Sequence, residues 1–341
     1  MAFYILSTLF FACVSTLGGQ IGWPRTFVIF GLMPMILLAL LRGNVGVDTA
    51  VYLQEIQKII EAGEYTHTFE PFFEGLILLL SSVLDNPRAI LATLGAFTTL
   101  FLFLGVMDKK QSMFIFCAFI IPTYYFDMVM NGIRYGLSFA IVFWAQQYLR
   151  EFQVKKFIVW VVVASLIQSS GGVLGLILYV LYSRQWKVLI GSGVLFGAGF
   201  TAAYPYFMAK LQSYSEIYTA SIFSGLSTLA VTACSLSIWM LDPGTRKNTL
   251  PACLVLLGLS FFMFGLAQYS YAGLRFLQLI SFGTFLYFAI SISGERVVLS
   301  NITKITLVAV AVVAFVLKMK NFSDSVGEGA SPFVPYMFFW E

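Results

Sequence analysis

The chain has 341 residues, of which 59% are hydrophobic and 11% are charged, and its formal net charge is +4. Soluble domains carry about 25% charged residues, so a water-exposed globular surface is excluded and lipid must be the main solvent. The basic residues are scattered through short connections, which excludes the basic patch of a nucleic-acid-binding protein.

The fold class expected from this composition is an all-α polytopic membrane protein. A helix needs about 20 mostly apolar residues to span a bilayer. The sequence predicts about 12 transmembrane helices in a single integral-membrane domain, 1–341. The first run lacks a preceding basic segment and an Ala-x-Ala cleavage site, so we expect it to be retained. The apolar runs are 3–22, 26–41, 88–107, 112–127, 133–149, 157–169, 171–182, 188–203, 222–241, 249–268, 275–292 and 303–319.

Two further helices are expected not to cross the membrane. The apolar run 72–84 is short and carries Glu74, which is typical of a re-entrant or interfacial helix. Near residues 48–62, Tyr52, Ile56 and Ile59 fall on one stripe while charged residues fall elsewhere. This pattern predicts an amphipathic helix along the external membrane face.

Charge sets the expected orientation. Basic clusters recur after every second apolar run, so all lie on one side, which the positive-inside rule makes cytoplasmic. The clusters are Lys109–Lys110, Arg150 with Lys155–Lys156, Arg184 with Lys187, Arg246–Lys247, and Arg296 with Lys304. The predicted external parts are therefore loops 42–87 and 204–221, the C-terminal tail 320–341, and both termini.

Three arginines end or begin spans on the predicted external side: Arg42, Arg134 and Arg275. Arginine at membrane depth normally faces a bundle interior or a polar cavity, although each side chain could instead reach the headgroups. Guanidinium groups bind phosphates bidentately, and Arg134 also lies near a helix N-terminus, which favours anions. A lipid-linked pyrophosphate fits these requirements, and an anionic lipid headgroup fits them less specifically.

Acidic residues supply candidate bases. Asp48 directly precedes the amphipathic helix, where it could also be a plain N-cap. Glu70 precedes Pro71, and Glu74 lies one turn into the short apolar helix. Desolvation raises the pKa of a carboxylate in such a setting, which suits a general base, whereas solvation at headgroup level is the alternative.

Metal and disulfide chemistry are not expected. The four cysteines, Cys13, Cys117, Cys234 and Cys253, lie in apolar runs without CxxC spacing and are predicted to be small buried hydrophobic residues. His67 is the single histidine, which removes multi-histidine metal sites from consideration. We therefore predict neither a metal nor a cofactor.

Several segments carry recognisable motifs in chain order. The segment from Leu41 to Tyr52 (LRGNVGVDTAVY) resembles the R-x-x-V-G-x-D-x-x-x-Y pattern of the EpsG/Wzy family of polysaccharide polymerases. Glu70-Pro71-Phe72-Phe73 is similar to its E-P-G-F segment, and the stretch from Asn131 to Ser138 (NGIRYGLS) to its N-x-I-R-Q-x-L-A segment. Arg275 and Pro335-Tyr336 also fall where family members carry Arg and Pro-Tyr.

Two departures from the family pattern concern the site. Gln168-Ser169-Ser170 stands where the family usually has H-x-S, and glutamine cannot act as a base. Tyr135 replaces the usual glutamine. These changes indicate altered sugar specificity or a member with a different task.

The resemblance implies joining of undecaprenyl-pyrophosphate-linked oligosaccharide repeat units at the outer face of the bacterial inner membrane. It implies catalytic roles for Asp48, Glu70 and Arg134, with either acid as the base. The partners are the lipid-linked glycan, membrane lipid and a chain-length regulator protein. The implied substrate-binding residues are Arg42, Tyr52, Gln168, Ser169, Tyr271, Arg275 and Tyr336.

Two other functions fit a similar composition. A lipid-linked oligosaccharide transporter or flippase could hold the same ligand with arginines, but transporters place such groups near the midplane in broken helices. A glycosyltransferase using a polyprenyl-phosphate sugar would add single residues. Candidate charges at one membrane face, beside long external loops, favour an enzyme.

Overall fold

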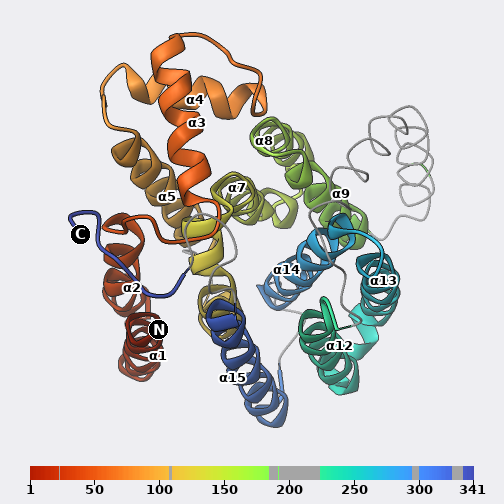
Figure 1. Ribbon diagram of the computed structural model, residues 1–341. Coiled ribbons are helices and arrows are strands. Elements are labelled where there is room, and N and C mark those ends of the chain that lie inside the picture. The colour runs from red at the N-terminus through yellow and green to blue at the C-terminus, as the bar shows by residue number, and fades with distance from the viewer. Residues whose placement is uncertain (23, 107–109, 184–190, 192–222, 294–298, 325–332) are drawn as a thin grey trace. The chain divides into compact units, whose positions relative to one another are not determined.

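The computed structural model describes residues 1–22, 24–106, 110–183, 191, 223–293, 299–324 and 333–341 (Figure 1). Every regular element in these ranges is a helix, and one isolated antiparallel bridge joins Arg42 to Phe338. The predicted span 188–203 and loop 204–221 lie outside the described residues. The chain divides into two compact units, Met1–Val173 with Phe315–Glu341, and Leu174–Ala314.

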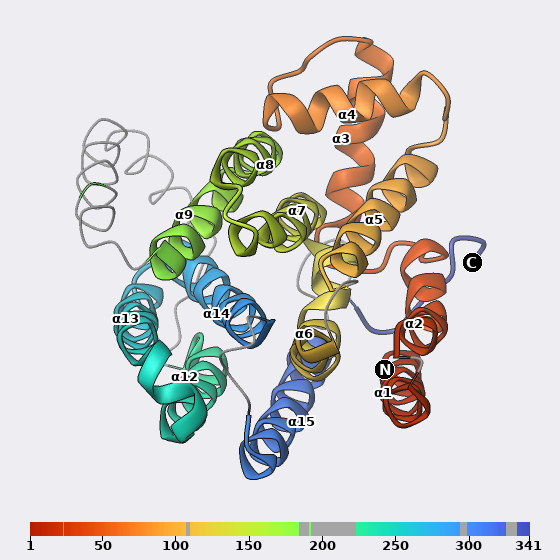
Figure 2. The same ribbon diagram turned by 180° about the vertical axis from the view of Figure 1, so that it is seen from behind.

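The first unit begins with two packed apolar helices, α1 (Ala2–Ile21) and α2 (Pro24–Leu40). Two short helices follow, α3 (Thr49–Ala62) and α4 (Pro71–Ser81), and then the longer α5 (Pro87–Leu104). Figures 1 and 2 show α3 and α4 crossing one another, with α4 beside α8 (Val154–Ile167).

The two predicted non-spanning helices are present as α3 and α4. In α3 the buried side chains include Tyr52, Ile56 and Ile59, so the predicted amphipathic stripe is confirmed. Helix α4 has 11 residues and begins at Pro71, whose fixed φ suits the first helical position. A helix of this length is about 16 Å long and is too short to cross a bilayer.

The middle of the first unit contains widened helices. After α6 (Lys110–Ile115) the chain forms two π-helices, η1 (Phe116–Tyr124) and η2 (Asp127–Asn131), before α7 (Ile133–Arg150). Pro122 lies inside η1, and a proline removes one backbone donor from the regular ladder. Short π-helical segments often mark functional sites.

The C-terminal residues pack against the beginning of the same unit. The Gly43 N–H donates to the Met337 carbonyl at 2.9 Å, and the Phe339 N–H donates to the Leu41 carbonyl at 3.0 Å. The Tyr4 hydroxyl donates to the Phe333 carbonyl at 3.0 Å. Residues 333–341 are therefore fixed to the ends of α1 and α2.

The second unit contains α12 (Leu226–Leu241), α13 (Pro243–Ala267) and α14 (Tyr271–Ser293), together with most of α9 (Ser169–Ser183) and of α15 (Asn301–Asp324). Its core includes Trp239 stacked on Phe288, with ring centroids 3.9 Å apart. Asp242 caps α13 by accepting from the Gly244 N–H at 2.7 Å. Aromatic stacking in the core and a capped helix start therefore stabilise this unit.

Five of the described helices are long and apolar enough to cross a membrane: α1, α5, α13, α14 and α15. Most of the other predicted spans form shorter apolar helices, and α7 is long enough but more polar. The chain is thus a multi-pass membrane protein, whereas a count of about 12 spans stays a prediction.

The prediction that the cysteines are buried is only partly right. Cys253 is buried, but Cys13 and Cys234 are exposed on apolar helices, and Cys117 is intermediate. All four are free thiols. Outward-facing cysteines are compatible with lipid as the surrounding solvent, which hydropathy cannot distinguish from a protein core.

Candidate functional site

The break between η2 and α7 organises the candidate site. Gly132 leaves helical geometry, with φ −89° and ψ 69°, and its N–H donates to the Asp127 carbonyl at 2.9 Å. The carbonyls of Val129 and Met130 accept hydrogen bonds from side chains between the end of α2 and the start of α3. The Val129 carbonyl accepts from Arg42 Nη1 at 2.7 Å and the Met130 carbonyl from Thr49 Oγ1 at 2.9 Å.

The segment before α3 is attached to this break. The Asp48 N–H donates to Asn131 Oδ1 at 3.2 Å. Gly46 has φ +101°, and a Cβ there would lie 2.3 Å from the Met130 carbonyl oxygen. Only glycine fits this close approach, so the Val45-Gly46-Val47-Asp48 motif serves to position Asp48 beside α7.

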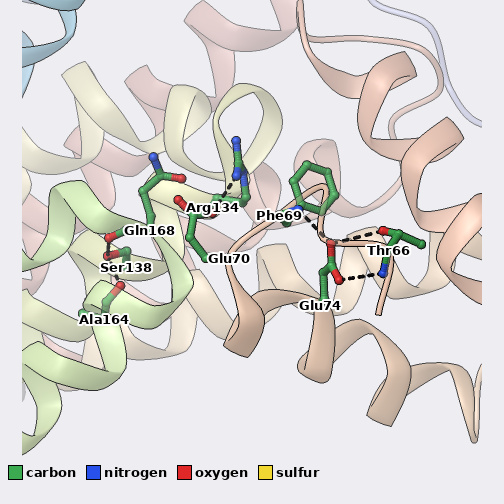
Figure 3. A network of polar contacts seen from close by, with 8 residues as sticks. All are labelled: Thr66, Phe69, Glu70, Glu74, Arg134, Ser138, Ala164 and Gln168. Atoms are coloured by element: carbon green, nitrogen blue, oxygen red, sulfur yellow. Dashed lines mark hydrogen bonds and ion pairs between the residues drawn. The ribbon is translucent and has the colours of Figure 1, made fainter. Parts of the chain in front are cut away.

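An ion pair joins Glu70 to Arg134 at the start of α7. Arg134 Nη1 lies 2.6 Å from Glu70 Oε2, and each side chain is 24% exposed. Figure 3 shows the two side chains pointing toward one another. Glu70 occupies the N-cap position of α4 but makes no cap hydrogen bond with its side chain, so its carboxylate is directed to Arg134.

Aromatic side chains surround this ion pair. The Arg134 guanidinium lies 4.6 Å from the Phe69 ring centroid, a cation–π contact. Tyr52, only 6% exposed, packs on Phe69 with ring centroids 5.9 Å apart and lies beside Arg134. Burial raises the pKa of Tyr52, the positive charge of Arg134 opposes this, and the negative charge of Asp48 adds to it.

Glu74 is bonded to the backbone of the loop that precedes α4. Its side chain is fully buried and accepts hydrogen bonds from the N–H groups of Thr66, His67 and Phe69, at 3.0, 3.1 and 2.8 Å, and from the Thr66 hydroxyl. Burial acts to raise the pKa of Glu74, but these hydrogen bonds outweigh it and hold the pKa below its ordinary value. The expectation of a raised pKa is wrong for Glu74, which fixes the loop leading to Glu70.

The turn containing Gln168 lies next to the same face of α7. Ser138 follows Arg134 by one helical turn, and its Oγ donates to the Ala164 carbonyl at 2.7 Å and to the Gln168 carbonyl at 3.4 Å. Figure 3 draws Gln168 together with Ser138 and Ala164. The position at which the resemblance implies a histidine therefore lies against α7, one turn from Arg134, and Ser169 is exposed beside it.

The remaining predicted site residues are Arg42, Tyr336, Tyr271 and Arg275. Arg42 and Tyr336 belong to the contact between α2 and the C-terminal residues, where the Tyr336 hydroxyl donates to the Leu38 carbonyl at 2.7 Å. Tyr271 and Arg275 belong to the second unit, where the guanidinium lies 4.8 Å from the tyrosine ring centroid. The convergence of Arg275 with the other arginines stays a prediction.

Phe69 and Ser138 beside the ion pair, and Arg88 near Arg42, were not predicted from the sequence. Phe69 directly precedes Glu70, and Ser138 is spaced four residues from Arg134, so helical spacing could have indicated the serine. Arg88 follows the N-cap Asn86 of α5, a signal that indicated only a helix start. Among the described residues, no three His, Cys, Asp or Glu side chains gather where they could hold a metal ion.

The helices long enough to cross a membrane, together with a partly exposed acid–arginine pair beside buried tyrosine, define a multi-pass membrane protein with a polar site at one end of α7. The model of the EpsG family matches residues 25–338, so the chain belongs to the EpsG family, a Wzy-like polysaccharide polymerase family. The resemblance found in the sequence is thereby confirmed. No curated protein and no solved structure shows a significant match.

Proposed function

We propose that this protein polymerises undecaprenyl-pyrophosphate-linked oligosaccharide repeat units at the outer face of the bacterial cytoplasmic membrane. Membership of a polysaccharide polymerase family supports the reaction class. The observation that carries the proposal is the Glu70–Arg134 pair, half-enclosed by Tyr52 and Phe69 with Asp48 nearby. It combines an acid and a cation, which this glycosyl transfer requires.

The reaction forms one bond and breaks another. A hydroxyl oxygen of the acceptor repeat unit attacks the anomeric carbon of the donor glycan, and the bond from that carbon to the pyrophosphate oxygen breaks. The electron pair leaves on the undecaprenyl pyrophosphate, and the hydroxyl proton passes to a carboxylate. General-base catalysis of this kind contributes about 10²–10⁴-fold.

Arg134 is suited to stabilise charge on the departing pyrophosphate. One nitrogen of the guanidinium holds Glu70, whereas Nε is buried and has no hydrogen-bond partner among the described residues. The Arg134 side chain is 24% exposed, so its accessible part could meet a pyrophosphate oxygen without displacing Glu70. Preorganised donors at a developing anion stabilise the transition state more than the ground state.

Glu70 is the favoured base in this arrangement, with Asp48 as the second candidate. Glu70 accepts from Arg134 through one oxygen, Oε2. Its other oxygen can accept a proton, because a carboxylate has two oxygens with about four acceptor positions. Gln168 would orient a sugar hydroxyl by hydrogen bonding, without taking its proton.

The test is conversion of purified undecaprenyl-pyrophosphate-linked cognate repeat units into longer lipid-linked glycans by the protein in nanodiscs. Glu70→Gln and Arg134→Gln are expected to lower the polymerisation rate by about 10²-fold or more. Asp48→Asn identifies the base, because the acid whose amide variant loses more activity carries the proton. Glu64→Gln, an exposed substitution between α3 and α4, is the matched control.

The assay also separates the competing functions. With the protein reconstituted in sealed proteoliposomes, repeat units that cross the bilayer without being lengthened would indicate the transporter. Addition of one sugar from a polyprenyl phosphate would indicate the single-residue transferase. Either result, obtained with the cognate repeat unit, would contradict polymerisation. Full activity of both Glu70→Gln and Arg134→Gln would contradict the assignment of the site.

A further inference from the structure

We propose that Arg42, Arg88 and the N-terminus of α5 form a binding pocket for the diphosphate of the polyprenyl carrier. This inference deepens the proposed function, on which it rests. The pocket lies in the first unit, between the end of α2, the start of α5 and the C-terminal residues. Its volume is about 210 Å³, and its polar lining includes Arg42, Gly43, Asn86 and Arg88.

Arg42 is a buried cation with unused donors. Its side chain is only 5% exposed, and Nη1 donates to the carbonyls of Ala39 and Val129. Nε and Nη2 are inaccessible to solvent and have no hydrogen-bond partner among the described residues. Buried guanidinium nitrogens without partners are costly, so a shift of the Arg42 side chain toward an anion in the adjoining pocket would satisfy an existing deficit.

Arg42 also stays charged at neutral pH. Burial lowers the pKa of the Arg42 guanidinium to about 10, and the positive charge of Arg88 acts in the same direction. Within the described part of the chain, neither arginine forms an ion pair with a carboxylate. The pocket therefore concentrates two positive charges that no carboxylate of the described residues pairs with.

The helix end adds a third source of positive potential. α5 begins at Pro87, and the side chain of Asn86 accepts from the Arg88 N–H at 2.9 Å. Arg88 Nη2 donates to Asn44 Oδ1 at 2.8 Å, which holds the guanidinium near the segment after Arg42. A helix N-terminus favours anions, and arginine pairs favour phosphate groups in particular.

Size and lining indicate an amphiphilic ligand. One water occupies about 30 Å³ in the liquid, so the pocket has room for a group the size of several waters, as a phosphate or diphosphate is. The remaining lining consists of alanine and leucine side chains of α2 and α5 and of Phe339. Such walls are suited to the first isoprene units that follow the diphosphate.

The pocket is linked to the ion-pair site through one short segment. Arg42 donates to the Val129 carbonyl, and Arg134 lies five residues later. Five residues span at most about 18 Å when fully extended, so a short stretch of backbone joins the two sites. A carrier held at Arg42 and Arg88 is therefore the acceptor, whose glycan hydroxyl would reach Glu70, while the diphosphate that departs from the donor lies at Arg134.

The test is equilibrium binding of undecaprenyl diphosphate to the full-length protein in neutral nanodiscs. Arg88→Gln is expected to weaken binding about tenfold or more, and Arg88→Lys is expected to recover part of the loss. Arg25→Gln, an exposed arginine at the other end of α2, is the matched control and should bind normally. Equal affinity of Arg88→Gln and the intact protein would overturn the proposal.

A second measurement needs no variant. Phenylglyoxal modification of Arg88, followed by mass spectrometry, should be suppressed by undecaprenyl diphosphate in the intact protein. Phosphatidylglycerol at the same mole fraction and free inorganic pyrophosphate at the same concentration should protect much less. Equal protection by phosphatidylglycerol would show an ordinary headgroup site, and equal protection by pyrophosphate would show that the carrier is not selected, so each result overturns the proposal.

The two proposals can fail separately. If undecaprenyl diphosphate binds in an Arg88-dependent manner but repeat units are not lengthened, the binding pocket is supported and the polymerase function is contradicted. If repeat units are lengthened but Arg88→Gln binds undecaprenyl diphosphate normally, the polymerase function is supported and the binding pocket is contradicted.

Discussion

At the scale of single residues, Glu74 and Glu70 have different surroundings. Glu74 holds the loop between α3 and α4 by hydrogen bonds, and Glu70 forms an ion pair with an arginine of α7. Glu74 accepts three backbone N–H groups and one hydroxyl, whereas Glu70, one turn earlier, is paired with Arg134. The loop fixed by Glu74 determines where Phe69 and Glu70 lie. The two acids therefore have different surroundings although they are only four residues apart.

Glu74→Gln tests the structural role. The amide retains one acceptor oxygen but places an NH₂ group among backbone donors, so we expect a loss of about 2 kcal/mol in stability. Because the folded-state pKa of Glu74 is lowered, its stabilisation is complete above the unfolded pKa and is lost as pH falls through the folded value. The unfolding temperature of Glu74→Gln should therefore depend less on pH below about 4.3 than that of the intact protein.

Glu64→Gln, exposed in the same loop, is again the control and should leave the unfolding temperature unchanged. An unfolding temperature of Glu74→Gln equal to that of the intact protein at pH 7 would contradict the structural role.

At the scale of elements, residues 42–49 are attached to the break between η2 and α7. This attachment fixes the distance between the Arg42–Arg88 pocket and the Glu70–Arg134 pair. Arg42, Thr49 and Asp48 all bond to residues 129–131. The interface depends on a carbonyl that approaches Gly46 too closely for any side chain.

Gly46→Ala tests this attachment, with Gly63→Ala as a control that also has positive φ. Gly63, the C-cap of α3, has φ +66° and open space around it, so alanine there should cost about 1–2 kcal/mol from backbone strain. Gly46→Ala adds a clash with the Met130 carbonyl and should cost more. Thermal unfolding measures both, and a larger loss for Gly63→Ala would contradict the close packing.

The elements also show what the sequence could and could not predict. Apolar runs predicted the described helices well, because side-chain transfer to lipid depends on local composition. The amphipathic stripe of α3 predicted which side chains are buried. The Glu70–Arg134 pair joins residues 64 apart, and no periodicity specifies such a contact. Likewise, no apolar pattern indicated that the carbonyls of Val129 and Met130 accept hydrogen bonds from Arg42 and Thr49.

At the scale of the whole molecule, the contact between residues 41–43 and 337–339 constrains membrane topology. Paired backbone segments must lie on the same side of the bilayer. Tyr4 contacts Phe333, so the beginning of α1 lies beside them. The number of spans between residues 43 and 333 must therefore be even. The predicted 12 spans fit this rule, because two precede residue 43 and ten follow it.

This rule gives a topology prediction that cysteine labelling can check. In a variant with Cys13, Cys117, Cys234 and Cys253 replaced by serine or alanine, single cysteines at the exposed Asn44 and Glu341 should react with a membrane-impermeant maleimide from the same side. We expect that side to be external, because the basic clusters predict the opposite face to be cytoplasmic. A cysteine in place of Lys155, within one basic cluster and exposed at the start of α8, should react only after permeabilisation. Labelling of positions 44 and 341 from opposite sides would contradict the pairing of the two segments. Labelling of both from the cytoplasm would agree with the pairing. It would also place both candidate sites on the opposite face from the one where lipid-linked glycans are polymerised.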